Sequence, residues 1–115
     1  MSAETINYEA IADFFQLLSH PARLQILDEL RRADACVCHL EIVLERPQAY
    51  VSQQVAVLRE AGVIEGQRDG LNVFYQISDS RLRPLLGELL GPAKSPRCVS
   101  GCACPKCMEE GSCGC

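Results

Sequence analysis

The sequence lacks tryptophan and has only three tyrosines and three phenylalanines among 115 residues, although 48% of its residues are hydrophobic. The core must therefore consist mainly of Leu, Ile, Val and Ala side chains, and this composition favours packed helices. A chain of this length can build one modest core and has little left for a second. We expect a single folded domain.

A strong positive charge and a long apolar segment are also missing. The formal net charge is -4, so any binding to DNA must depend on local basic residues and on a close fit. No stretch approaches about 18 consecutive apolar residues, and the first residues lack a basic segment followed by an apolar run. We therefore expect a cytoplasmic protein with no membrane partner.

The eight cysteines are distributed unevenly, with two in residues 1–97 and six in residues 98–115. In a cytoplasmic protein such thiols indicate metal ligands or redox groups before they indicate disulfides. Residues 92–115 are rich in Gly, Pro, Ser and Cys, and they have almost no apolar side chains to bury. We divide the chain into a folded domain, residues 1–91, and a Cys-rich metal- or metalloid-binding tail, residues 92–115.

Apolar periodicity predicts short helices interrupted by one hairpin. The expected helices are residues 7–18, 21–32, 37–44, 47–62 and 80–90, and the expected strands are residues 63–68 and 71–77. Asp69-Gly70 is a two-residue turn signal between the strands. The last helix carries more leucine than one chain is expected to bury, which predicts a homodimer.

The helix that begins at Pro47 has two different faces. With Val51 at the centre of the buried face, Val55 and Leu58 lie within about 40° of it. The opposite side carries small and amide side chains: Ala49, Ser52, Gln53 and Ala56. Such a face suits contact with DNA, and it equally suits a solvated surface.

The segments LLSHPARLQILDELRRADACVCHL and VSQQVAVLREAGVIEGQRDGLNVFYQI resemble the ArsR/SmtB family of metal- and metalloid-responsive repressors, over roughly residues 8–90. The resemblance implies a mainly α-helical, homodimeric winged helix-turn-helix with a small β-hairpin wing. It places DNA-contacting positions on the fourth helix at Gln48, Ala49, Tyr50, Ser52 and Gln53. Arg68 and Asn72 beside the wing turn are further candidates. Glutamine suits a bidentate contact with adenine, and serine suits a phosphate or a base edge. Pro47 and Gln54 replace the Ser and His common in the family.

Cys36 and Cys38 form a Cys-x-Cys pair. Residues i and i+2 of an α-helix lie about 200° apart, so both thiols can bind one ion only if Cys36 precedes the helix and Cys38 lies in its first turn. Exposed helix amides there also stabilise a thiolate. Arsenite-sensing relatives resemble CVCDLC, whereas Glu41 stands here at the third position. The resemblance therefore supplies two ligands, and two inert, partly buried thiols remain the alternative.

The tail offers further thiols, because Cys98, Cys102, Cys104, Cys107, Cys113 and Cys115 lie within 18 residues. One possibility is a three-thiolate site formed by Cys113, Cys115 and one of Cys102, Cys104 or Cys107. The other is that the tail lends ligands to Cys36 and Cys38. Because Glu41 stands where the third thiol of the family motif would be, the three-thiolate site within the tail is favoured. Soft thiolates select trivalent arsenic or antimony, Cd, Pb, Zn or Cu(I).

These observations predict a repressor that binds operator DNA as a dimer and dissociates when antimonite or arsenite binds Cys thiolates. Three alternatives stay open: a Cd-, Pb- or Zn-sensing repressor of the same fold, a thiol redox or persulfide switch, and a metallothionein-like metal buffer. The sequence does not pair a nucleophile with a base, so we expect neither an enzyme nor an organic cofactor.

Overall fold

The computed structural model describes residues 5–95, which form five helices and one antiparallel hairpin. The helices are α1 (Tyr8–Leu18), α2 (Pro21–Arg32), α3 (Val37–Leu44), α4 (Gln48–Glu60) and α5 (Leu82–Leu90), and the strands are β1 (Ile64–Asp69) and β2 (Asn72–Ile77). These bounds agree with the predicted elements to within two residues. The six tail cysteines lie outside the described residues.

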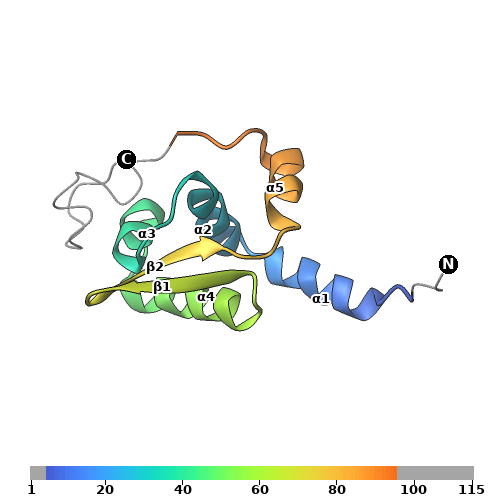
Figure 1. Ribbon diagram of the computed structural model, residues 1–115, viewed down its shortest axis with the longest axis horizontal. Coiled ribbons are helices and arrows are strands. Elements are labelled where there is room, and N and C mark those ends of the chain that lie inside the picture. The colour runs from blue at the N-terminus through green and yellow to red at the C-terminus, as the bar shows by residue number, and fades with distance from the viewer. Residues whose placement is uncertain (1–4, 96–115) are drawn as a thin grey trace.

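Helices α2, α3 and α4 form the body of the domain, and the hairpin lies against α2 and α4 (Figure 1). Each helix contributes fully buried aliphatic side chains, including Ile26, Leu40 and Val51. Val55 and Leu58 are also buried, which confirms the predicted inner face of α4. Burial of one such side chain contributes about 1.5–3 kcal/mol, so this shared core holds α4 in place.

Two local predictions need correction. Pro47 was expected to open the fourth helix, but its ψ of 149° is extended and α4 begins at Gln48. The wing turn is Gly70-Leu71, not Asp69-Gly70, because Asp69 pairs with Asn72 as the last rung of the hairpin. Gly70 has φ 66° and occupies the first central position, where a glycine meets no steric penalty.

Apolar surface remains exposed on the first and last helices. Helix α1 extends away from the body (Figure 1), and the exposed fractions of Tyr8 and Phe15 are 74% and 54%. On α5 Leu82 and Leu86 are buried, whereas Leu89 is 64% exposed. A single chain therefore leaves part of the predicted leucine surface uncovered. Within residues 5–95 none of the helices has the length and apolar character needed to span a bilayer.

Candidate nucleic-acid interface

The first half of α4 turns a polar, uncharged surface outward. Gln48, Ala49 and Gln53 are exposed, and Tyr50 and Ser52 are half-buried. These are the five positions predicted for DNA contact on this helix. The helix period keeps all five off the buried side of α4, so that each is at least partly exposed.

A partly buried hydrogen bond fixes α4 against α2. The Nε of Arg23 donates to Oε1 of Gln54 at 2.9 Å, and the Nη1 of Arg23 donates to the carbonyl of Leu17 at 3.2 Å. Gln54 is only 7% exposed. Its place three residues after Val51 puts it on the buried face, so the helix period in the sequence already indicates its burial. At this position the side chain positions the helix from behind.

Tyr50 lies close to the side chains of Arg46 and His20 at the start of α4. The guanidinium of Arg46 lies 5.0 Å from the centre of the Tyr50 ring. The centre of the His20 ring lies 6.5 Å from the centre of the Tyr50 ring, and His20 is the N-cap residue of α2. A cation over an aromatic face is attracted by the ring quadrupole. Arg46 thus adds a positive charge beside the exposed end of α4, which the sequence analysis missed because Arg46 precedes the helix.

The wing, defined here as β1, the turn Gly70-Leu71 and β2, carries the other predicted contacts. Arg68 is exposed on β1, and Asn72 is half-buried at the start of β2. Leu71 at the tip is 96% exposed. Asn72 and Gln48 both line an open pocket of about 260 Å³. The structure therefore brings the start of α4 and the start of β2 to one place.

The thiol pair lines the same pocket. Cys36 is the N-cap residue of α3 with φ -89° and ψ 166°, and its sulfur accepts a hydrogen bond from the amide of His39 at 3.4 Å. Cys38 lies in the first turn and is half-buried. Both thiols can bind one ion only if Cys36 precedes the helix and Cys38 lies in its first turn, and the backbone has this arrangement. Within residues 5–95 the structure gathers no group of three His, Cys, Asp or Glu side chains that could hold a metal ion.

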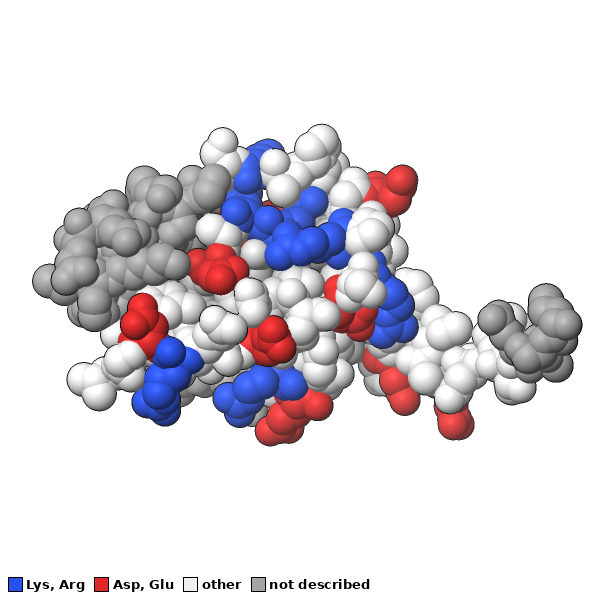
Figure 2. All heavy atoms as spheres, viewed as in Figure 1, with Lys and Arg blue, Asp and Glu red and all other residues white. Residues whose placement is uncertain are grey.

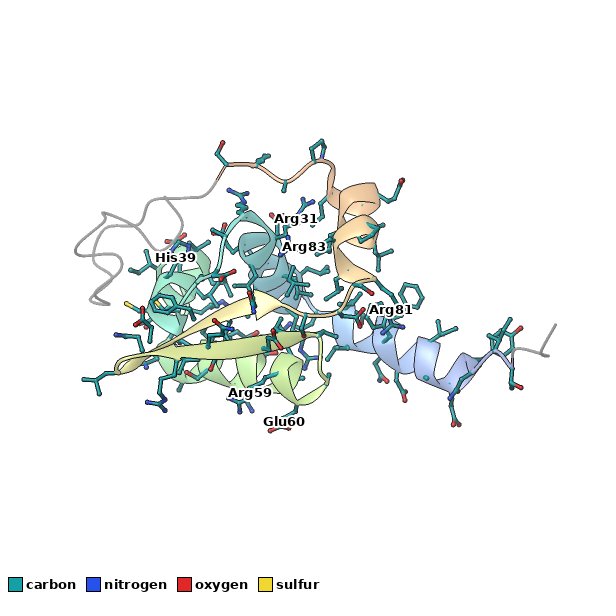
Figure 3. The ribbon with its side chains drawn as sticks, viewed as in Figure 1. Arg31, His39, Arg59, Glu60, Arg81 and Arg83 are labelled. Atoms are coloured by element: carbon teal, nitrogen blue, oxygen red, sulfur yellow. The ribbon has the colours of Figure 1, made fainter. Side chains whose placement is uncertain are left out.

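A buried contact between two side chains joins α2 to α3 beside the thiols. The Oε2 of Glu29 lies 3.2 Å from the Nε2 of His39, and the two side chains are 3% and 2% exposed. The Nε of Arg32 lies 3.7 Å from the other oxygen of Glu29. Figure 3 labels His39 on α3. This pair was also missed, since Glu29 and His39 lie on separate predicted helices and nothing in the spacing links them.

The side chains of Arg31 and Arg83 form hydrogen bonds within the domain. Arg31 donates to the carbonyl of Gly91 at 2.7 Å, and Arg83 donates to the carbonyl of Arg31 at 3.3 Å. Figure 3 shows Arg31 and Arg83 close together where α2 meets α5. On the face drawn in Figure 2, basic and acidic side chains are interspersed. Charge on this face therefore provides no broad attraction for a polyanion.

Four helices, a two-stranded wing and a final helix follow one another in the described residues, and this order defines a winged helix-turn-helix domain. Residues 20–65 match the family described as "Bacterial regulatory protein, arsR family". The chain is 40% identical over 90 residues to the uncharacterized HTH-type transcriptional regulator Rv0081 of Mycobacterium tuberculosis, covering 76% of this chain and 74% of that protein. The chain belongs to the ArsR family of bacterial regulatory proteins.

Other relatives agree with this assignment. The HTH-type transcriptional repressor SmtB of M. tuberculosis is 36% identical over 85 residues, which are 74% of this chain and 63% of that protein. The chain thus spans less than two thirds of the length of the SmtB relatives that it matches. The crystal structure of Rv0081 has a TM-score of 0.67 at 36% identity, covering 75% of this chain and 87% of that one.

The transcriptional repressor BigR from Xylella fastidiosa has a TM-score of 0.65 at 30% identity, covering 72% of this chain and 85% of that one. The names of these relatives describe transcriptional regulators and repressors. They confirm the expectation that the chain is not an enzyme.

Proposed function

We propose that this protein is a homodimeric transcriptional repressor that binds operator DNA through α4 and the wing. Binding of a trivalent metalloid, antimonite or arsenite, to Cys thiolates releases it. The observation that carries the proposal is the shared pocket where Cys36 and Cys38 adjoin Gln48 of α4 and Asn72 of the wing. A ligand at the thiols would lie directly beside the surface that contacts DNA.

In this proposal α4 enters the major groove. Gln48 and Gln53 are exposed and suit bidentate contact with adenine, and Ser52 suits a phosphate or base edge. Ala49 allows close approach, whereas Tyr50 supports the helix start together with Arg46. Arg68 on the wing provides a positive charge for the DNA backbone.

The dimer would form through the apolar side chains left exposed on α1 and α5. These include Ile11 and Phe15 on α1 and Leu89 and Leu90 on α5, which are 40–64% exposed. Two-fold symmetry would place the two α4 helices about 34–36 Å apart, the spacing of successive major grooves. An operator with inverted half-sites would match this arrangement.

The inducer would act by favouring a dimer geometry that fits DNA less well, since a ligand equally compatible with both states changes nothing. Soft thiolates suit trivalent antimony or arsenic, and Cd, Pb or Zn are the alternative inducers. The thiolates come from Cys36 and Cys38, from the tail, or from both. The tail candidates are Cys102, Cys104, Cys107, Cys113 and Cys115.

Fluorescence anisotropy of a labelled duplex from upstream of the protein's own gene tests the proposal. Reduced full-length protein would be titrated with antimonite, arsenite and Cd. Two full-length variants run in parallel: Cys36→Ser/Cys38→Ser, and a variant with the six tail cysteines changed to serine. We expect tight binding by all three proteins and release by metalloid in the wild type. The variant that no longer responds identifies the sensing thiols.

Absence of binding to that duplex by all three proteins would overturn the repressor for this operator. Binding with no response to any ion would overturn the metalloid inducer. A thiol redox switch is a second candidate, because Cys36 and Cys38 are separated by one residue and line the same pocket. It predicts release by hydrogen peroxide without metal, and recovery of binding with dithiothreitol.

A further inference from the structure

The side chain of Arg46 brings a positive charge to the start of α4. It is exposed, and its guanidinium carbon lies 5.0 Å from the centre of the Tyr50 ring. Among residues 5–95 the carboxylates that form ion pairs lie 2.7–3.7 Å from Arg31, Arg32, His39 and Arg81, and none of them is paired with Arg46. Arg46 therefore keeps a charge that the described part of the fold does not neutralise.

The backbone around Arg46 is fixed by the turn that joins α3 to α4. Glu45 has the left-handed angles φ 55° and ψ 45°, and Pro47 has φ -58° and ψ 149°. The amide of Arg46 donates to the carbonyl of Glu41 at 3.4 Å, which ties the turn to α3. Arg46 is therefore held at the junction of the two helices, and its side chain reaches Tyr50 in the first turn of α4.

The Tyr50 ring gives this guanidinium a defined support. Tyr50 is half-buried and packs against the hydrophobic core. A guanidinium over an aromatic face is attracted by the ring quadrupole, while its N–H donors lie in its own plane and stay available to an acceptor. Phosphate suits such donors, because its oxygens can accept two parallel N–H bonds. A side chain that is already held in place also loses less conformational entropy when it binds.

We propose that Arg46 contacts a phosphate of the DNA backbone and that Tyr50 holds its guanidinium in position for this contact. The inference deepens the proposed function and rests on it for the docking of α4. Tyr50 then acts through Arg46 and not through its own hydroxyl group. Because the formal net charge is -4, local basic residues must supply the attraction for DNA, and the loss of one should be measurable.

The salt dependence of binding tests the phosphate contact. Fluorescence anisotropy with the upstream duplex is measured between about 50 and 200 mM NaCl for the full-length wild type, Arg46→Gln and Arg46→Lys. A homodimer would make two such contacts, and each contributes about 0.9 to the slope of log K against log [salt], so Arg46→Gln should lower its magnitude by about 1.8. At about 0.15 M salt this is a loss of affinity of about thirtyfold. Arg46→Lys keeps the charge and should keep the wild-type slope.

Arg59→Gln is the matched control, because it removes the same charge from another exposed arginine of α4. Arg59 lies in the last turn of this helix, at the end opposite to Arg46 (Figure 3). Its slope should equal that of the wild type. Urea unfolding shows whether Arg46→Gln is folded, and its midpoint should be nearly unchanged because the side chain is exposed.

A double-mutant cycle tests the part assigned to Tyr50. Tyr50→Phe keeps the ring and should bind DNA as the wild type does. Tyr50→Leu removes the ring and should weaken binding about fivefold, because fewer molecules then hold the guanidinium in the competent position. In the Arg46→Gln background the same change should have no further effect on DNA affinity. Weaker binding by Tyr50→Phe would assign the contact to the hydroxyl group and overturn this role of the ring.

A wild-type slope in Arg46→Gln, or an equal loss in Arg59→Gln, would overturn the phosphate contact. Phosphate contacts carry no sequence information, so a duplex of scrambled sequence separates this inference from the proposed function. If the wild type prefers the upstream duplex and Arg46→Gln keeps the full slope, the repressor stands and the contact fails. If both duplexes bind equally and Arg46→Gln lowers the slope on each, the contact stands and the repressor fails for this operator. Absence of binding to either duplex overturns both.

Discussion

The buried contact between Glu29 and His39 gives a direct test of what holds α3, and with it the thiols, against α2. The carboxylate and imidazole are 3.2 Å apart, and both side chains are almost fully buried. We consider Glu29→Ala, His39→Ala and the double variant. Each single change removes the contact between the two side chains and leaves the other member buried beside a cavity.

The magnitude follows from this burial. A hydrogen bond to a charged group contributes about 1.5–3 kcal/mol, and the cavity left by truncating a buried side chain adds to the loss. Arg32 is 3.7 Å from Glu29 and retains part of the local charge balance. We therefore expect each single change to lower the free energy of unfolding by about 2–4 kcal/mol. The double variant should lose about 1–2 kcal/mol less than the sum, because the first change has already removed the contact between the two side chains.

Urea unfolding of the reduced full-length protein, followed by circular dichroism at one protein concentration, measures these losses. The fixed concentration matters because association stabilises the folded state. Glu88→Ala on α5 is the matched control, since this exposed glutamate should change stability by less than about 0.5 kcal/mol. If the losses for Glu29→Ala and His39→Ala add within about 0.5 kcal/mol, the pair does not couple and the reasoning is refuted.

Other predictions concern α4, the wing and the start of α5. Leu58→Ala should lower the free energy of unfolding by about 2–5 kcal/mol in urea titrations, because Leu58 is fully buried. Gln53→Ala should leave unfolding within about 0.5 kcal/mol of wild type yet weaken operator binding by about 1–3 kcal/mol in anisotropy; equal DNA affinity would remove Gln53 from the interface. Gly70→Val should destabilise the wing by about 1 kcal/mol or more in thermal melts, because φ is 66° there; an unchanged melting temperature would contradict this turn geometry. The hydrogen bond from the Arg81 side chain holds the pKa of Asp79 below its ordinary value of 3.8. The stabilisation from this pair is therefore complete above about pH 4, and it is lost as the pH falls through the lower folded pKa. Asp79→Asn should remove this acid-dependent part of the free energy of unfolding. Identical dependence on pH in the variant and the wild type would exclude the pair.

The secondary structure was largely readable from the sequence because it depends on local periodicity. The repeat of Leu and Ile in residues 21–32 gave the bounds of α2, and the period around Val51 gave the inner face of α4. The predicted turn, Asp69-Gly70, was wrong by one residue. In the structure Asp69 pairs with Asn72, so Gly70 and Leu71 form the turn. That choice depends on the register of the whole hairpin and not on the turn residues alone.

The candidate site shows the same division. The Cys-x-Cys spacing by itself determined that both thiols can share a ligand only at the start of a helix, and α3 begins at Val37, directly after Cys36. Tertiary structure decided what surrounds them. The wing approaches the thiols through Val73 because strands and helices distant in sequence pack together, and the contact of Glu29 with His39 arises in the same way. Residue spacing along one helix encodes a face, whereas the partner of that face is set by how the elements pack.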